Sequence, residues 1–210
     1  MSLSRKAPFS VQLDDSISIR LRPLVGTDGD RIKRAYQLLS PESRLNRFWD
    51  KHELLSDERA EHLTSTDDRN HFAWIVLHGS DDAFPGYGAA SCWRDPEDPQ
   101  RAEISCTIVD EVQRSGIGTL LLSILWFEAW HLGVREFYGI ARRENQALVE
   151  WFSSLDAQLT FGSRHIEVAL PLTSPEECVD RVQYGLEFGA RRIILADWMQ
   201  DWIAMCREGK

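Results

Sequence analysis

The sequence predicts an α/β fold built on one mixed sheet. Ile17–Leu24 alternates apolar and polar residues, which is typical of a strand with one buried face. Three more strand-like stretches lie between residues 71 and 109, and a turn of small residues then leads into an apolar helix at 117–132. Strand, helix and strand patterns follow that helix. Hairpins first and a strand–helix–strand crossover later indicate a sheet that mixes the two kinds of connection.

Helices are expected between the first strand and the hairpins. Residues 26–40 carry an apolar face and offer Thr27 and Asp28 as capping candidates. Pro41 either ends this helix or begins a short second one, and Ser56 is a candidate N-cap for a third. The remaining elements are expected in this order: strands at 71–77, 85–94 and 101–109, a helix at 117–132 stopped by Gly133, a strand at 134–141, a helix from Asn145 to Leu155, and a strand at 163–172.

Three segments divide the chain. Residues 1–16 are expected to form an N-terminal arm, residues 17–172 the main domain, and residues 173–210 a C-terminal helical extension. The extension carries an apolar stripe at helical spacing, formed by Leu195, Trp198, Met199, Trp202, Ile203 and Cys206. Such a stripe must be buried. It docks on the main domain, forms a homodimer interface, or caps a substrate cleft.

Composition excludes several classes of protein. The chain has 210 residues, of which 43% are hydrophobic, enough for a large core. A net charge of −9 argues against nucleic-acid binding, which needs a basic face. No apolar run reaches membrane-spanning length and no signal-peptide pattern follows Met1, so we expect a cytoplasmic protein without a membrane partner. Neither the four cysteines nor the six histidines show ligand spacing, so no metal is expected.

The turn before the apolar helix has the features of an anion site. Its sequence is Gln-Arg-Ser-Gly-Ile-Gly, residues 113–118. The first N–H groups of a helix have no partner within the helix, and the helix dipole adds partial positive charge there. Glycine lets a phosphate approach those amides without a Cβ in the way. A nucleoside-triphosphate loop is excluded because no lysine follows Gly118, and a dinucleotide fingerprint because Leu121 stands at its third glycine position.

A third phosphate-binding motif matches the sequence of this turn. The run Gln113-x-x-Gly116-x-Gly118 resembles the Q/R-x-x-G-x-G/A signature of the GNAT superfamily of acetyltransferases. The resemblance covers residues 17–172, because the order of elements matches as well. The stretches SPESRLNRFW and RAEISCTIVDEVQRSGIG look like the bacterial protein-lysine acetyltransferases that modify acyl-CoA synthetases. The resemblance implies a GNAT-like acyl-CoA N-acyltransferase fold and acetyl-CoA as cosubstrate.

The resemblance also assigns the cosubstrate contacts. Ile108 and Val109 would pair with the pantetheine arm of the coenzyme, and one of their N–H groups would receive the oxyanion of the tetrahedral intermediate. Asn145 would contact the same arm, besides its role as a helix N-cap. The pyrophosphate would lie on the turn, formed by Gln113, Arg114, Ser115, Gly116, Ile117, Gly118 and Thr119.

Glu103 is the candidate general base. An amine nucleophile must lose a proton, and a nearby carboxylate can accept it. Strand alternation places Glu103 on one face with Ser105 and Thr107, and the glutamate assigned as base in the resembling enzymes stands at this position. The alternative is an ordinary sheet-edge glutamate paired with Arg101 or Arg94.

The chain departs from the family pattern at one catalytic position. Phe152 stands where many members carry a tyrosine acid, which leaves Tyr138 and Tyr87 only as guesses for that role. Thiolate can leave without an acid because a thiol has a pKa near 8.5. Cys106 invites an acyl-enzyme interpretation, but alternation turns it away from Glu103 and no histidine partners it.

These expectations describe an N-acetyltransferase acting by direct attack in a ternary complex. The acceptor is a primary amine, with a protein lysine favoured. A small-molecule amine acetyltransferase and a non-catalytic acyl-CoA-binding module are the alternatives.

Overall fold

The computed structural model describes residues 8–12, 18–50, 52–174 and 177–178. The strands are β1 Phe9–Gln12, β2 Ser18–Pro23, β3 His71–His78, β4 Gly88–Arg94, β5 Arg101–Ile108, β6 Glu136–Arg142, β7 Gln158–Phe161 and β8 His165–Pro171. The helices are α1 Gly29–Gln37, α2 Pro41–Phe48, α3 Asp57–Thr64, α4 Ile117–His131 and α5 Gln146–Ser153, with short 3₁₀ turns η1 Gly26–Asp28 and η2 Asp110–Val112.

The described strands form one mixed sheet in the order β1-β2-β3-β4-β5-β6-β8-β7. Neighbours pair antiparallel except β5 and β6, which are parallel and are joined by the crossover helix α4. This matches the expected hairpins followed by a strand–helix–strand unit. Two strands were not expected: β1 lies in the segment predicted as an arm, and β7 pairs with β8 after α5.

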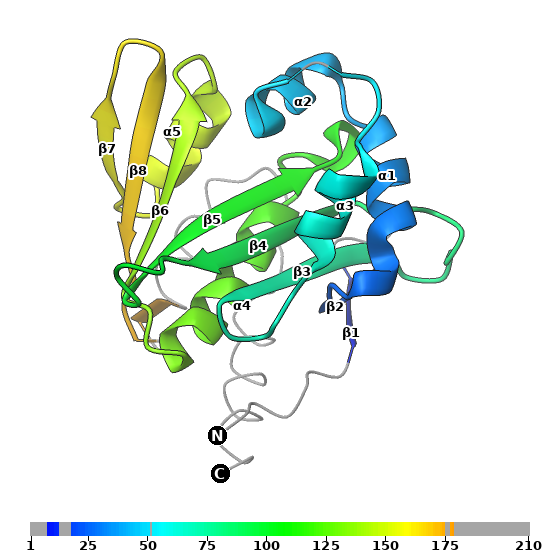
Figure 1. Ribbon diagram of the computed structural model, residues 1–210, viewed down its shortest axis with the longest axis horizontal. Coiled ribbons are helices and arrows are strands. Elements are labelled where there is room, and N and C mark those ends of the chain that lie inside the picture. The colour runs from blue at the N-terminus through cyan, green and yellow to red at the C-terminus, as the bar shows by residue number, and fades with distance from the viewer. Residues whose placement is uncertain (1–7, 13–17, 51, 175–176, 179–210) are drawn as a thin grey trace.

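Helices cover both faces of the sheet. Figure 1 shows α1, α2 and α3 in front of the central strands and α4 behind them. Helix α4 is apolar on all sides, and nearly all of its residues from Ile117 to Ala129 are buried. Trp74 of β3 donates its indole N–H to the carboxylate of Glu128 at 2.8 Å, which ties the sheet to this helix. Among the described helices, none is long and apolar enough to cross a bilayer.

The predicted helix boundaries agree closely with the structure. Pro41 begins α2 at its first turn, with Ser40 as the N-cap. Ser56 caps α3 by accepting the Arg59 N–H at 3.2 Å. Gly133 follows α4 with φ +89°, as a helix stop requires. The apolar stripe of residues 195–206, and with it the predicted dimer interface, lies outside the described residues.

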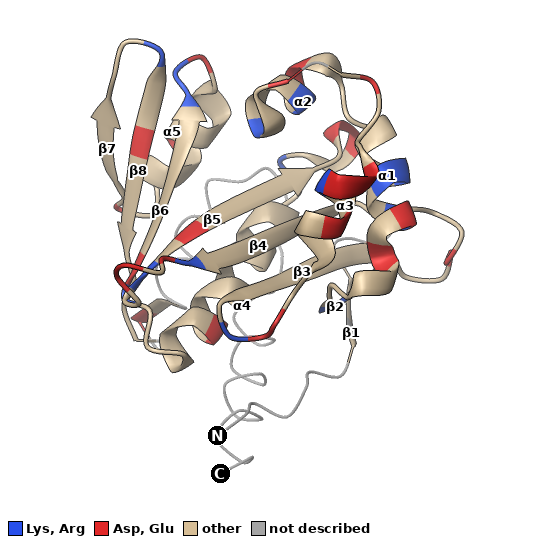
Figure 2. Cartoon of the chain, viewed as in Figure 1, with Lys and Arg blue, Asp and Glu red and all other residues tan. Residues whose placement is uncertain are grey.

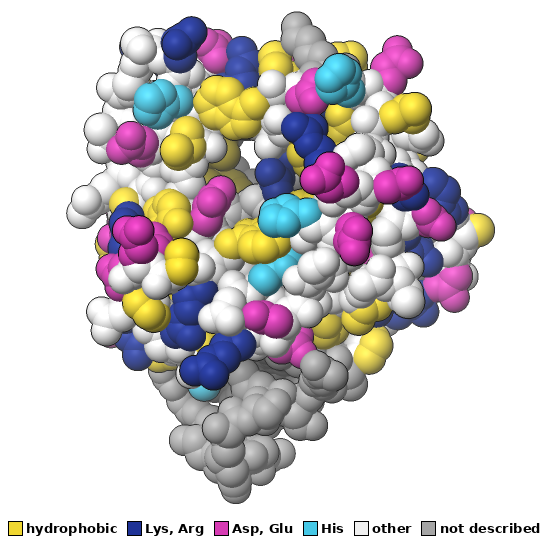
Figure 3. Space-filling model, viewed as in Figure 1, with side chains coloured by type: hydrophobic (Ala, Val, Ile, Leu, Met, Phe, Trp, Pro, Cys, Tyr) yellow, Lys and Arg dark blue, Asp and Glu magenta, His cyan; other side chains and the backbone are white. Residues whose placement is uncertain are grey.

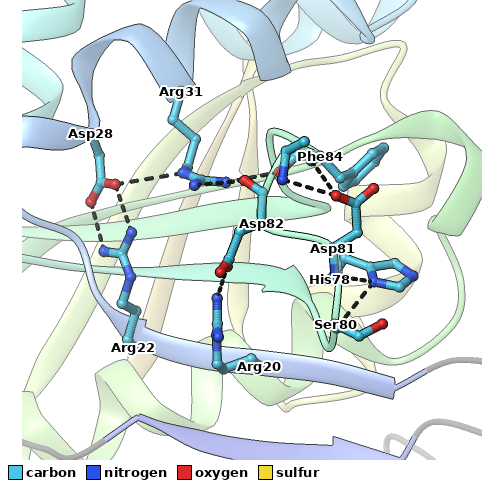
Figure 4. Close-up of polar contacts among 10 residues, drawn as sticks. Arg20, Arg22, Asp28, Arg31, His78, Ser80, Asp81, Asp82 and Phe84 are labelled. Carbon is cyan, nitrogen blue, oxygen red and sulfur yellow. Dashed lines mark hydrogen bonds and ion pairs between the residues drawn. The ribbon is translucent and has the colours of Figure 1, made fainter.

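Asp28 differs from its predicted role as a helix cap. It stands at the N-cap of α1 but makes no capping bond there. Its buried carboxylate instead accepts two hydrogen bonds from the Arg22 guanidinium, at 2.7 and 2.6 Å, and lies 3.7 Å from Arg31 Nε (Figure 4). Arg31 in turn donates to the carbonyl of Phe84, at 2.8 Å. The network joins β2 and α1 to the β3–β4 loop.

The sheet separates between β5 and β6. The two strands pair only at Arg101–Glu103 with Glu136–Tyr138, and beyond Glu103 they diverge. Figure 1 shows β5 running toward α2 while β6 turns away with β8 and β7. An unpaired length of β5 therefore faces an open space in the middle of the sheet.

Candidate active site

A cavity of about 1420 Å³ occupies the space between β5 and β6. Its lining includes the strand β5, the turn before α4, the helix α5 and the cavity side of α2. A hollow between α2 and the β6–β8 part opens on the face viewed in Figure 3. Glu103 and most residues of the glycine turn line this same cavity, so the two predicted halves of the site are brought together.

Alternate residues of β5 direct their backbone N–H and C=O groups toward the cavity. Val109 donates its N–H to Tyr87 O at 2.9 Å, toward β4. Successive residues of an antiparallel strand turn their N–H and C=O groups to opposite sides, so Ile108 and Cys106 direct theirs toward the gap. Val109 is therefore corrected: its N–H is already bonded and its side chain is buried, so it is no pantetheine partner or oxyanion donor. Ile108 keeps the predicted placement.

The turn before α4 exposes helix amides to the cavity. Gly116 is the N-cap of α4 with φ +90°, and Arg114 also has a left-handed φ of +62°. The first N–H of α4 that bonds back to a carbonyl is that of Leu120, on Gly116 O at 2.9 Å. In the described part of the chain, the amides of residues 117–119 have no protein acceptor outside the helix. The turn therefore leaves main-chain donors that an anion could use, as the predicted cradle requires.

Three residues of the turn carry distinct roles. Arg114 is exposed, and its backbone shapes the turn. Ser115 turns inward instead, where its buried hydroxyl donates to Val112 O at 2.6 Å. Gln113 also turns toward the protein: its amide donates to Ile108 O at 3.0 Å and to Ser43 Oγ at 3.2 Å. The side chains of Ser115 and Gln113 therefore hold the turn together, and only their backbones remain for an anion.

Gly118 is not demanded by packing inside the protein. A Cβ built there would lie 3.7 Å from the Trp151 ring and 3.8 Å from Ile108 Cγ1, which is ordinary van der Waals contact. The protein alone would therefore accept a small side chain. A ligand that must reach the neighbouring amides gives a reason for glycine.

Helix α5 closes the far side of the turn. Asn145 caps α5 by accepting the Leu148 N–H at 3.2 Å, and it lines the cavity. Trp151 donates its indole N–H to Thr119 Oγ1 at 3.1 Å, which joins α5 to the first turn of α4. Phe152 is buried beside it, so no hydroxyl occupies the position of the family's tyrosine. Thr119 thus contributes its hydroxyl to packing and its amide to the cradle.

Glu103 is exposed to the cavity and has neither of the ion pairs considered for it. Arg101 pairs with Glu136 at 2.7 Å, and the Arg94 guanidinium bonds the carbonyls of Pro99 and Leu132. Within the described residues no cation lies within ion-pair distance of Glu103. A carboxylate in this position is available to accept a proton.

Aromatic side chains lie on the same side of the sheet as Glu103. Trp93, opposite Glu103 in the β4–β5 register, is stacked between His71 and His62, with ring centroids 3.4 and 4.5 Å away. Burial lowers the pKa of His71, which favours a neutral ring in this stack. Trp49, which is 51% exposed, also lines the cavity. No motif assigns a role to these side chains, although Trp49 ends the SPESRLNRFW stretch, so none of them was predicted from the sequence.

Helix α2 is fastened to the start of the turn. Asp110 accepts the Ser40 N–H and hydroxyl at 2.9 and 2.7 Å, and the Ser43 hydroxyl at 2.8 Å. Burial opposes ionisation of Asp110, but these hydrogen bonds outweigh it and lower the pKa of the carboxyl. Ser43 also accepts a hydrogen bond from the Gln113 side-chain amide, which links this glutamine of the turn directly to α2. Figure 2 shows basic positions on α2 at one side of the gap and acidic positions on β5 and β8.

Cys106, Tyr138 and Tyr87, the other candidate catalytic residues, are not set up for catalysis in the cavity. Cys106 lines the cavity, but burial raises the pKa of its thiol to about 12, so little thiolate forms at neutral pH. Tyr138 donates to Asp95 at 3.3 Å, and Tyr87 packs on Phe84. Neither tyrosine is among the described residues that line the cavity. The described residues contain no group of three potential metal ligands.

Curated relatives of the chain include two acetyltransferases. The acetyltransferase Pat of Mycolicibacterium smegmatis is 28% identical over 152 residues, which cover 71% of this chain and 44% of that protein. An acetyltransferase of Pseudomonas aeruginosa is 27% identical over 140 residues, covering 65% of this chain and 73% of that protein. The chain thus corresponds to less than half of the mycobacterial relative. No family model matches the chain.

Solved structures show the same fold. The GNAT domain of Streptomyces lividans PAT superposes with a TM-score of 0.69 at 20% identity, covering 79% of this chain and 97% of that domain. The Salmonella typhimurium protein YncA, solved with its cofactor acetyl-CoA, gives a TM-score of 0.58 at 20% identity, covering 74% and 95%. A cAMP-binding acyltransferase from Mycobacterium smegmatis gives 0.58 at 21% identity, covering 95% of this chain and 54% of that one. The chain has the GNAT fold and resembles protein acetyltransferases.

Proposed function

We propose that the chain is an acetyl-CoA-dependent N-acetyltransferase that acts on a primary amine, with a protein lysine as the favoured acceptor. One observation carries the proposal: a single cavity is lined both by Glu103, which has no ion-pair partner among the described residues, and by residues of the turn at the start of α4. The cavity passes through the gap between β5 and β6, so a donor and an acceptor can meet inside the sheet. The acetyltransferase names of the relatives support the reaction class.

The residues present fit the cosubstrate. The amides of Ile117, Gly118 and Thr119 suit the pyrophosphate, with Arg114 able to add a charged contact. Ile108 directs its N–H toward the gap, where an extended pantetheine arm can pair with it as another strand would. Asn145 can contribute its amide NH₂, because only its oxygen is used in capping.

Direct attack requires a neutral amine. A lysine amine has a reference pKa of about 10.4, so it is almost wholly protonated at neutral pH. The neutral fraction of the amine attacks the acetyl carbon, and Glu103 would accept the proton that the nitrogen then loses, directly or through water. The thiolate of coenzyme A then leaves. Trp49, which is exposed at the cavity, offers an apolar face along which an aliphatic amine side chain can lie.

Acetyl transfer from labelled acetyl-CoA to proteins and to a panel of small amines tests the proposal. Glu103→Gln is expected to lower kcat/KM about 10²- to 10⁴-fold, the usual contribution of a general base. Glu61→Gln, an exposed glutamate of α3 outside the cavity lining, is the matched control and should keep wild-type activity. Full activity of Glu103→Gln across pH would remove the base assignment. Acetyl-CoA binding without transfer to any acceptor would identify a non-catalytic acyl-CoA-binding module instead.

A further inference from the structure

Arg47 is a cavity residue whose charge the fold does not neutralise. It lies on α2, and its guanidinium has one polar partner among the described residues, Ser105 Oγ at 2.7 Å. Ser105 in turn shares a hydrogen bond of 2.7 Å with Ser91. The guanidinium also packs over the Phe48 ring, 5.0 Å from its centroid. No carboxylate of the described chain lies within ion-pair distance of Arg47.

Such an arrangement is unfavourable unless another group uses it. Burial lowers the pKa of Arg47, which reflects the cost of holding its charge away from water. Arg47 is half-buried, and a cation held partly away from water without a charged partner destabilises a fold. A guanidinium has five N–H donors, and a serine oxygen satisfies only part of them. The free donors of Arg47 are therefore available to an acceptor that enters the cavity.

Contacts along one face of α2 fix the position of Arg47. Ser43 and Arg47 are four residues apart and share one face of α2. Ser43 is held by Asp110 and Gln113, next to the glycine turn, while Arg47 is held by Ser105 in the middle of β5. Helix α2 is thus fastened along one face to the strand and turn that bind the donor in the proposed function.

Arg47 lies beside the part of β5 along which the thioester would extend in the proposed function. Ser105 stands two residues from Glu103 on the same face of β5, and Cys106 turns its N–H toward the gap beside it. Arg47 is close enough to interact electrostatically with both Cys106 and Glu103. A thioester whose chain pairs with β5 and whose carbon is attacked from the Glu103 side would carry its oxygen into this neighbourhood.

We propose that Arg47 is a second catalytic residue, whose guanidinium stabilises the oxyanion that forms on the thioester carbonyl oxygen in the tetrahedral intermediate. The inference rests on the proposed acetyl transfer. The amine lone pair forms the new C–N bond as the carbonyl π pair moves to oxygen, where Arg47 compensates the charge. The oxyanion then re-forms C=O, the C–S bond breaks with its electron pair on sulfur, and the amine proton passes to Glu103. Ser105 acts as a positioning residue for the guanidinium.

The position of Arg47 favours the reacting carbonyl over a carboxylate on the acceptor. An acceptor carboxylate would make Arg47 a binding residue, and its loss would raise the KM for the acceptor. An oxyanion exists only after attack, so loss of its donor lowers kcat and leaves both KM values nearly unchanged. This split between kcat and KM separates the two roles.

Steady-state kinetics of Arg47→Gln and Arg47→Lys with acetyl-CoA and the best acceptor test the proposal. Arg47→Gln is expected to lower kcat about 10²- to 10³-fold, as removal of one oxyanion donor does elsewhere. Arg47→Lys keeps the charge without the planar fork and should recover part of that loss. Arg44→Gln, one turn earlier on α2 and packed over Tyr36 away from the cavity lining, is the matched control and should keep the wild-type kcat.

Two measurements keep the outcomes distinct. Thermal melting and calorimetric acetyl-CoA binding on each variant show whether α2 and the donor site are intact, and both should match wild type. A wild-type kcat in Arg47→Gln, or a defect confined to the acceptor KM, overturns the catalytic role while the proposed acetyl transfer stands. A wild-type protein that transfers no acetyl group to any acceptor overturns the proposed function itself.

Discussion

At the scale of single residues, the surroundings of a cavity side chain, rather than its residue type, decide which role it can have. Glu103 and Cys106 both lie on β5, yet the first is exposed and has no ion-pair partner among the described residues, while the second has its thiol pKa raised to about 12 by burial. A thiol of that pKa is a poor nucleophile because almost none of it is ionised at neutral pH. The carboxylate therefore suits proton transfer, and the cysteine suits packing.

Removing the Cys106 sulfur should leave catalysis intact. Cys106→Ala is expected to change kcat/KM by less than about threefold, because direct attack needs no acyl-enzyme. Steady-state kinetics, together with intact-protein mass spectrometry after mixing with acetyl-CoA, check this. An acetylated Cys106 that decays at the rate of turnover would replace the ternary-complex mechanism with a two-step one.

At the scale of elements, two attachments shape the site. Helix α4 begins at a left-handed glycine that leaves its first amides free, and Trp151 of α5 packs against the same turn through Thr119. Helix α2 is fastened to η2 through Asp110. The proposed donor and acceptor sites would therefore be built from different elements that meet at the end of β5.

A side chain at Gly118 should block the cradle without disturbing the fold. Gly118→Val is expected to weaken acetyl-CoA binding about 30-fold or more, because the loss of charge-assisted hydrogen bonds of about 2–3 kcal/mol corresponds to such a factor. Calorimetric titration measures the affinity, and melting temperature reports the fold. Gly29→Ala is the control, since a Cβ at Gly29 meets nothing within 4 Å and this glycine is helical. Unchanged affinity in Gly118→Val would place the coenzyme elsewhere.

At the scale of the whole molecule, the sheet must stay open in its middle and hold together at its edges. The Asp28 network joins β2, α1 and the β3–β4 loop on one side of the gap (Figure 4). Burial opposes ionisation of Asp28, but hydrogen bonds from Arg22 and Val25 outweigh it and lower its pKa. Its ionised form therefore contributes stability above the unfolded pKa of about 4, and that contribution is lost as pH falls below it.

Asp28→Asn should destabilise the fold in a pH-dependent way. Replacing the carboxylate leaves Arg22 without its charge partner and is expected to cost about 2–4 kcal/mol at pH 7, somewhat below a fully buried pair because Arg22 is partly exposed. The difference from wild type should shrink as pH falls below 4. Asp82→Asn, which removes the exposed partner of Arg20, should change the free energy of unfolding by less than about 1 kcal/mol. Urea denaturation from pH 3 to 7 measures both, and equal effects of the two variants would contradict the structural role of Asp28.

Local pattern was enough for the order of the elements and for the start of α4. Strand alternation, helix caps such as Ser56 and the stop at Gly133 depend on neighbouring residues only, so they can be predicted from the sequence. The glycine turn was predictable for the same reason, because φ and amide exposure are set within a few residues. The face on which Glu103 lies followed from the two-residue period of a strand.

Only the tertiary structure decided which predicted groups are available. The N–H of Val109 is bonded to Tyr87 and the side chain of Gln113 to Ile108 and Ser43, and both results depend on strand pairing and packing between distant segments. Strands β1 and β7 exist because partners pair with them, not because their own sequences are strongly patterned. The location of Arg47 was decided in the same way. From the sequence, an arginine on an amphipathic helix predicts a solvated charge, whereas its place in the cavity follows from how α2 packs on β5.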